Sequence, residues 1–148
     1  MPNETFSVKQ IDHVELCVPD QYEAARWYEQ VLGLRILNDL EQWASDGPLM
    51  ISSDNGSTML ALFKCDPPGS RPLVGHKRVA FRVDGSGFFD FLDHIEHVPV
   101  YGNEGQRVLR KDVVDHDKSW SIYFCDPFGN RYEVTSYDYE QIRSELSK

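Results

Sequence analysis

Positive charge is scarce in this chain of 148 residues, which has 15 Lys and Arg against 24 Asp and Glu and a formal net charge of −9. Proteins that hold phosphate backbones or anionic lipid surfaces do so with clustered Lys and Arg. The composition therefore argues against nucleic acid and against a membrane surface as partners.

Long hydrophobic segments are absent as well. No run of about 18 consecutive apolar residues, the length that predicts a transmembrane helix, occurs in the chain. The first residues, MPNETFSVKQ, contain no apolar core of signal-peptide length. We therefore expect neither membrane spanning nor export, and we predict a cytoplasmic protein.

Cysteine is also rare, with Cys17, Cys65 and Cys125 as the three in the chain. Their number is odd, they are far apart, and no CxxC pair is present. This spacing favours neither a disulfide framework nor a structural zinc site. Because free cysteine is often buried, we expect three free and mostly buried thiols.

The first half of the chain has the pattern of one strand, one helix and three more strands. Apolar and polar residues alternate over residues 11–18, as in a strand with one buried face. A helix follows over residues 19–34, with Asp20 at its start and Gly33 at its end. An Asn-Gly pair at residues 55–56 joins the last two strands. The three further strands are expected over residues 35–44, 49–54 and 57–64.

The second half repeats this order, and the two halves resemble degenerate copies of one unit. The repeat predicts two βαβββ modules, over residues of about 9–64 and about 76–137, joined by a Pro- and Gly-rich linker at residues 65–75. A C-terminal helix is expected over about 138–146. The second module's elements are expected at 77–85 (strand), 86–97 (helix), and 106–115, 120–126 and 130–136 (strands).

The predicted fold class is α+β, with the two modules forming one curved eight-stranded mixed sheet, or cup, and the helices on its outer face. Alternation along each strand predicts which side chains face the cup. Charged groups are costly to bury unless they are paired or bind a metal, so their number indicates a ligand site. The predicted set includes His13, Glu15, Phe63, His76, Arg78, Arg82, Tyr123, Arg131 and Glu133.

Three segments of the sequence are typical of one known family. They are IDHVELCVPD at residues 11–20, RVAFRV at 78–83 and IYFCDPFGNRYEV at 122–134. With them the chain resembles, from about Ile11 to Tyr137, the vicinal oxygen chelate superfamily, which includes glyoxalase I, extradiol ring-cleaving dioxygenases, and bleomycin- and fosfomycin-resistance proteins.

The segment from Val114 to Glu133 is similar to the signature of extradiol dioxygenases. That resemblance implies that Glu133 is a metal ligand and that His116 and Tyr123 are catalytic groups that move protons and bind substrate. Ring cleavage is the most specific reaction that it suggests. The residues that match are Val114, His116, Ile122, Tyr123, Asp126, Pro127, Gly129 and Glu133.

The resemblance further implies that His13 and Glu133 hold a divalent metal, Fe²⁺, Mn²⁺, Ni²⁺ or Zn²⁺. The family's second His falls at Arg78, whose guanidinium has no lone pair to donate to a metal. Three alternatives follow. His76 takes its place through a bulge, Glu15 takes its place, or no metal binds and Arg78 forms a salt bridge with Glu133.

The expected function is therefore a metal-dependent small-molecule enzyme of the glyoxalase or dioxygenase type. The alternative is a metal-free protein of the bleomycin-resistance type that binds a small ligand. In that case Arg78, Arg82 and Arg131, beside Glu15 and Phe63 in the pocket, favour an anionic or planar aromatic ligand. By resemblance we also expect a homodimer.

Overall fold

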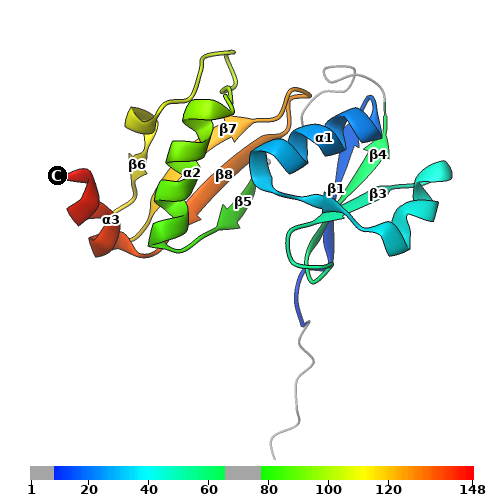
Figure 1. Ribbon diagram of the computed structural model, residues 1–148, viewed down its shortest axis with the longest axis horizontal. Helices are drawn as coiled ribbons and strands as arrows, with labels where there is room; N and C mark the ends of the chain where they lie inside the picture. Colours follow the sequence, from blue (N-terminus) through cyan, green and yellow to red (C-terminus); the bar gives the residue numbers. More distant parts are fainter. Residues whose placement is uncertain (1–8, 66–77) are drawn as a thin grey trace, which may run out of the picture. The chain divides into compact units, whose positions relative to one another are not determined.

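The computed structural model describes residues 9–65 and 78–148 (Figure 1). The chain divides into two compact units, Met1–Asp66 and Pro67–Lys148. Each unit holds a four-stranded mixed sheet with a helix across one face (Figure 1). The α+β class and the two βαβββ modules that the sequence predicts are confirmed.

In the first unit the strands lie in the order β1-β4-β3-β2. The β1–β4 pair is parallel and the other pairs are antiparallel. Helix α1 packs against β4 and β3. The elements are β1 (His13–Val18), α1 (Gln21–Leu32), β2 (Arg35–Ile36), the 3-10 helix η1 (Asn38–Ser45), β3 (Leu49–Ser52) and β4 (Met59–Lys64).

The predicted ends of α1 are confirmed. The side chain of Asp20 accepts a hydrogen bond from the Glu23 amide at 3.0 Å, which satisfies one of the free amides of the first turn. Gly33 ends the helix with φ 70°, a left-handed conformation that glycine adopts without steric cost. The buried face of α1 consists of Ala24, Ala25, Tyr28 and Val31.

The strand predicted over residues 35–44 is wrong beyond its first two residues, because a 3-10 helix, η1, replaces it. Leu37 and Leu40 both pack against the apolar cluster of Met50, Met59 and Ala61. Residues three apart lie on one side of a 3-10 turn but on opposite faces of a strand. The turn, in which the Leu40 amide donates to the Leu37 carbonyl, therefore places both leucines against the cluster.

In the second unit the strand order is β5-β8-β7-β6. The β5–β8 pair is parallel and the other pairs are antiparallel. Helix α2 packs against β8. The elements are β5 (Val79–Arg82), α2 (Gly85–His97), the 3-10 helix η2 (Arg110–Asp112), β6 (Val114–Asp115), β7 (Trp120–Cys125), β8 (Arg131–Ser136) and α3 (Tyr139–Leu146).

The strand predicted over residues 106–115 is also mostly wrong, since only Val114 and Asp115 form β6. The side chain of Asp112 accepts a hydrogen bond from the Leu109 amide at 2.8 Å, and the Asp112 amide donates to the Leu109 carbonyl. An Asp side chain that bonds to nearby backbone in this way competes with strand pairing. The segment therefore turns before β6 begins.

The turn between β7 and β8 is built on the buried carboxylate of Asp126. Its Oδ1 accepts hydrogen bonds from the amides of Phe128 and Asn130, at 2.9 and 2.8 Å. Its Oδ2 accepts from the Asn130 side chain at 2.7 Å. Gly129 adopts φ 93°, which other residues rarely adopt. This turn sets the register in which Tyr123 lies opposite Glu133.

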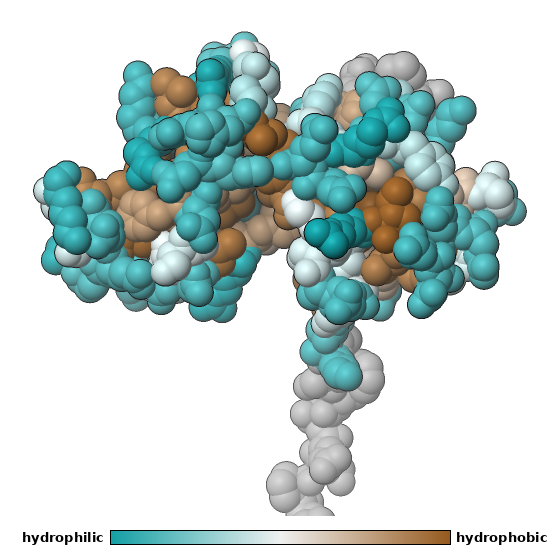
Figure 2. Space-filling model, in the orientation of Figure 1, coloured by the Kyte–Doolittle hydropathy of each residue, from teal (hydrophilic) through white to brown (hydrophobic). Residues whose placement is uncertain are grey.

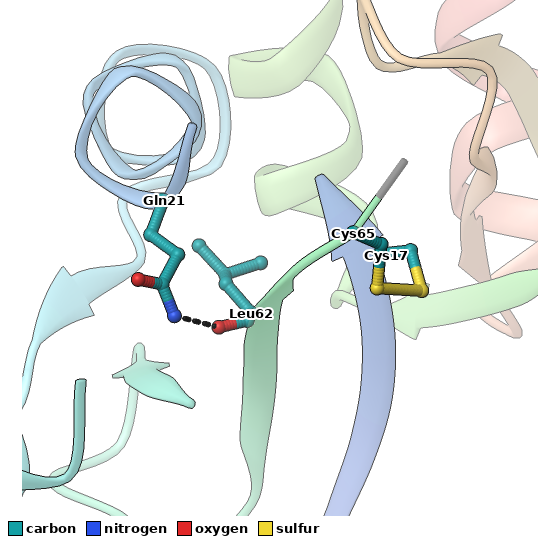
Figure 3. The surroundings of a disulfide bond; sticks show 4 residues. All are labelled: Cys17, Gln21, Leu62 and Cys65. Atoms are coloured by element: carbon teal, nitrogen blue, oxygen red, sulfur yellow. Dashed lines mark hydrogen bonds between the residues drawn. A yellow bond between two sulfur atoms is a disulfide. The ribbon is translucent and has the colours of Figure 1, made fainter. Parts of the chain in front are cut away.

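The prediction of three free thiols is wrong for two of them, because Cys17 and Cys65 form a disulfide (Figure 3). Cys17 lies opposite Phe63 in the β1–β4 pair, and Cys65 follows directly after β4. The two Cα atoms are 5.1 Å apart although 48 residues separate them in the chain. The parallel pairing of β1 with β4 brings the two cysteines together, which their spacing in the sequence did not indicate. Cys125 is a free thiol, as predicted.

The strands are hydrogen-bonded as two four-stranded sheets over the described ranges. Their joining into one eight-stranded cup stays a prediction. His76 and most of the expected linker lie outside the described residues.

Within residues 9–65 and 78–148, no helix has both the length and the apolar character to span a bilayer. Hydrophilic residues cover most of the face drawn in Figure 2, with smaller hydrophobic patches between them.

The disulfide should stabilise the protein mainly by restricting the unfolded chain. For a loop of 48 residues, loop-closure entropy corresponds to about 4 kcal/mol. We expect reduction, or the Cys17→Ser/Cys65→Ser variant, to lower the free energy of unfolding in urea by up to this amount. Cys125→Ser is the matched control. Equal unfolding midpoints for oxidised and reduced protein would contradict this prediction.

Candidate functional site

The second sheet has one apolar and one polar face. Helix α2 covers the apolar face, where Ile122, Phe124, Tyr132 and Val134 are buried. The opposite face, which we call the polar face, carries Arg78, Ala80, Arg82, Ser121, Tyr123, Cys125, Arg131, Glu133 and Thr135.

Strand register fixes the centre of the polar face. Tyr123 of β7 pairs with Glu133 of β8, and Glu133 pairs with Ala80 of β5. Residues paired across strands lie side by side on one face. Tyr123 and Glu133 are half-buried, whereas the small side chain of Ala80 is exposed. Glu133 therefore has a bulky phenol on one side and little steric cover on the other.

The structure brings together His116 and Tyr123, the two residues predicted to be catalytic. His116 Nε2 and the Tyr123 hydroxyl are hydrogen-bonded at 2.8 Å. The two rings meet edge to face, with centroids 6.2 Å apart. A phenol and an imidazole at this distance can exchange a proton directly.

The pKa of Tyr123 is raised above its ordinary value of 10.0, first by burial and then by the negative charge of Glu133. Arg78 opposes this shift, because its guanidinium lies 4.6 Å from the centroid of the Tyr123 ring. The phenol therefore keeps its proton at neutral pH. In the resting site Tyr123 can act as a proton donor but not as a base.

Glu133, predicted to be a metal ligand, is held by a serine hydroxyl. Ser121 is fully buried and donates to Glu133 Oε2 at 2.7 Å. The same hydroxyl lies 2.9 Å from Thr135 Oγ1. Strand alternation predicts that Ser121 and Tyr123 share the cup face, but Ser121 was not among the predicted site residues. An ion pair between Glu133 and Arg78 stays a prediction.

The other basic residues of the polar face lie around this centre. Arg131 pairs with Cys125 in the sheet, and the Arg82 guanidinium stacks 4.6 Å from the Tyr137 ring centroid. Burial and the charge of Asp126 raise the pKa of the Cys125 thiol, although Arg131 and Arg78 act in the opposite direction. Cys125 is therefore not activated as a nucleophile.

In the first unit, His13 lies between two carboxylates. Its Nδ1 is 2.9 Å from Asp12 and its Nε2 is 3.2 Å from Glu15. These two hydrogen bonds, that of Asp12 first, raise the pKa of His13 above 6.5. Phe63, predicted to line the pocket, is partly buried and packs against the apolar cluster of Met50, Met59 and Ala61. Contact between Phe63 and a ligand stays a prediction.

The described residues do not fit a three-ligand metal centre. Residues 9–65 and 78–148 contain no group of three or more His, Cys, Asp or Glu that could hold an ion. Arg78 places a fixed positive charge beside Tyr123 and donates no lone pair. A histidine must be neutral to bind metal, whereas both ring nitrogens of His13 contact carboxylates that favour the imidazolium form.

His13 should titrate above its ordinary pKa in the metal-free protein. Because the folded-state pKa is raised, its contribution to stability is full below about pH 6.5 and is lost as pH rises through the folded-state pKa. We expect Asp12→Asn and Glu15→Gln each to lower the His13 pKa in an NMR titration. A wild-type pKa at or below the ordinary value would contradict this.

Solved structures share the fold at low sequence identity. A glyoxalase/dioxygenase from Nostoc punctiforme has 22% identity and a TM-score of 0.65, with 93% of this chain and 99% of that chain covered. The fosfomycin resistance protein FosX from Listeria monocytogenes, complexed with Mn(II) and sulfate, has 13% identity and a TM-score of 0.64, with 95% and 99% covered. Oxidase ChaP-H2 has 21% identity and a TM-score of 0.61, with 88% and 94% covered.

None of the curated proteins matches this sequence significantly. The family model does match, over residues 10–134, which include β1 and most of β8. The topology of both units agrees with that match. The chain therefore belongs to the Glyoxalase/Bleomycin resistance protein/Dioxygenase superfamily.

Proposed function

We propose that the polar face of the second sheet binds a small organic anion and transfers a proton to it, with Arg78 as the electrostatic centre. The observation that carries this proposal is the convergence of three groups. The Arg78 guanidinium lies over the Tyr123 ring, and the Tyr123 hydroxyl is bonded to His116. Members of this superfamily bind small-molecule substrates, which supports a small ligand.

Arg78 would attract a ligand oxygen that carries negative charge. Superfamily members often use a divalent metal for this purpose, and the resemblance to the family implies that Arg78 stands in place of its second metal-binding histidine. A guanidinium is planar, always charged, and matches a carboxylate with two parallel hydrogen bonds. Arg131, on the same face, adds a second positive charge near Cys125. The favoured ligand is therefore a carboxylate on a planar ring.

Tyr123 and His116 would supply acid–base chemistry. Tyr123 carries its proton at neutral pH because burial and Glu133 raise its pKa. It can donate that proton to a ligand oxygen, and His116 can return one through the 2.8 Å hydrogen bond. Glu133, fixed by Ser121, accepts hydrogen bonds from ligand hydroxyl groups.

Salicylate is a suitable probe, because it places a carboxylate beside a second oxygen on an aromatic plane. We expect Arg78→Gln to weaken salicylate binding by tenfold or more in calorimetric titration, since a hydrogen bond to a charged group contributes about 1.5–3 kcal/mol. Arg110→Gln is the matched control, because Arg110 pairs with Asp93 and Glu96 on α2 instead. Equal affinity of wild type and Arg78→Gln would disprove the role of Arg78.

A metal-dependent enzyme, including an extradiol dioxygenase, is the second candidate. It is favoured by the superfamily's frequent use of divalent metals and by the Mn(II) bound to the FosX relative. In that case His13 and Glu133 would be ligands, with His76 or Glu15 as a third. The ion would act as a Lewis acid toward two neighbouring substrate oxygens.

Metal content distinguishes the two candidates. Under the first proposal, untagged protein prepared without chelator should hold well under one metal ion per chain by mass spectrometry, and Arg78→His should increase that content. Stoichiometric Fe²⁺, Mn²⁺, Ni²⁺ or Zn²⁺ in the wild type, lost in both His13→Ala and Glu133→Ala, would instead establish the metal-dependent enzyme.

We also propose a homodimer, because superfamily members of this size commonly form dimers. Light scattering can test this.

A cytoplasmic location is a further proposal. The Cys17–Cys65 disulfide weighs against it, because disulfides persist mainly in oxidising compartments.

A further inference from the structure

The residue that carries the predicted acid–base group, His116, lies just outside regular structure. Strand β6 is two residues long, both of them exposed, and it ends at Asp115. His116 follows in a tight turn, in which the His116 amide donates a hydrogen bond to the Ser119 carbonyl at 2.9 Å. Asp117 adopts φ 67°, a left-handed conformation that carries a steric cost for residues other than glycine. The short edge strand alone does not determine where the imidazole lies.

Asp115 closes this turn with both of its carboxylate oxygens. Oδ1 accepts a hydrogen bond from the Asp117 amide at 2.8 Å. Oδ2 accepts one from the hydroxyl of Tyr139, also at 2.8 Å. The first bond supports the left-handed residue, and the second connects the turn to α3, 24 residues farther along the chain.

Tyr139 is itself fixed in place. Its ring stacks on Trp120 of β7, with centroids 5.6 Å apart and an interplanar angle of 18°. Its carbonyl accepts a hydrogen bond from Trp120 Nε1 at 3.3 Å. Ile142, one turn farther along α3, is fully buried. The Tyr139 hydroxyl is therefore attached to the same strand, β7, that carries Tyr123.

We propose that Asp115 and Tyr139 are positioning residues that hold the His116 turn where Nε2 meets the Tyr123 hydroxyl. The chain of contacts runs from β7 through Trp120 and Tyr139 to Asp115, and returns to β7 through His116 and Tyr123. These contacts connect both members of the proton-transfer pair, His116 and Tyr123, to strand β7. The inference rests on the proposed function only in assigning acid–base chemistry to that pair.

The test uses Tyr139→Phe in the full-length protein, a change that keeps the ring and its stacking and removes the hydroxyl. Side-chain nitrogen NMR of His116 is the readout, and Tyr123→Phe identifies the signal of a His116 that has lost its partner. We expect Tyr139→Phe to shift the His116 Nε2 resonance toward its position in Tyr123→Phe. Asp115→Ala, which removes both bonds, should shift it farther.

Tyr22→Phe is the matched control. Tyr22 donates to Glu41 at 2.9 Å in the first unit, so this variant also removes an exposed tyrosine–carboxylate bond. It should leave the His116 resonance unchanged. Wild-type His116 signals in folded Tyr139→Phe would overturn the inference. The readout needs no ligand, so positioning can be confirmed even if salicylate binding by Arg78 fails, and the reverse also holds.

Discussion

The register of the β7–β8 hairpin is the constraint on which the rest of the site depends. Asp126 is buried and its carboxylate accepts three hydrogen bonds within the turn, so the turn cannot slip by a residue without leaving that charge unsatisfied. A slip of one residue would move Tyr123 to the face that α2 covers. The turn residues Asp126 to Asn130 therefore have a structural role that the site requires.

The two units differ in the charges that surround their central titratable groups, Tyr123 in the second unit and His13 in the first. In the second unit, the positive charge of Arg78 and the negative charge of Glu133 flank one phenol and act on its pKa in opposite directions. In the first unit, Asp12 and Glu15 surround His13 and favour its protonated form. These charges favour a protonated imidazole in the first unit and a protonated phenol in the second.

Covalent and side-chain bonds join strands of both sheets to neighbouring elements. Among the described strands, β1 lies at the edge of its sheet beside β4, and the Cys17–Cys65 disulfide joins the ends of these two strands. Gln21, on α1, also donates to the Leu62 carbonyl of β4 at 2.7 Å (Figure 3). Strand β6, at an edge of the second sheet, is joined to α3 through Asp115 and Tyr139. Side-chain bonds thus replace the ladder bonds that edge strands lack.

The sequence by itself determined both modules, the ends of α1, the family, and the grouping of Tyr123 with Glu133, because periodicity, caps and turn residues act over a few neighbours. The tertiary structure alone decided the Cys17–Cys65 disulfide, which depends on pairing across 48 residues. It also decided the 3-10 turn that packs Leu37 and Leu40 against the apolar cluster. The bond from Tyr139 to Asp115 was likewise decided by the tertiary structure, since it joins residues 24 apart whose proximity no local pattern encodes.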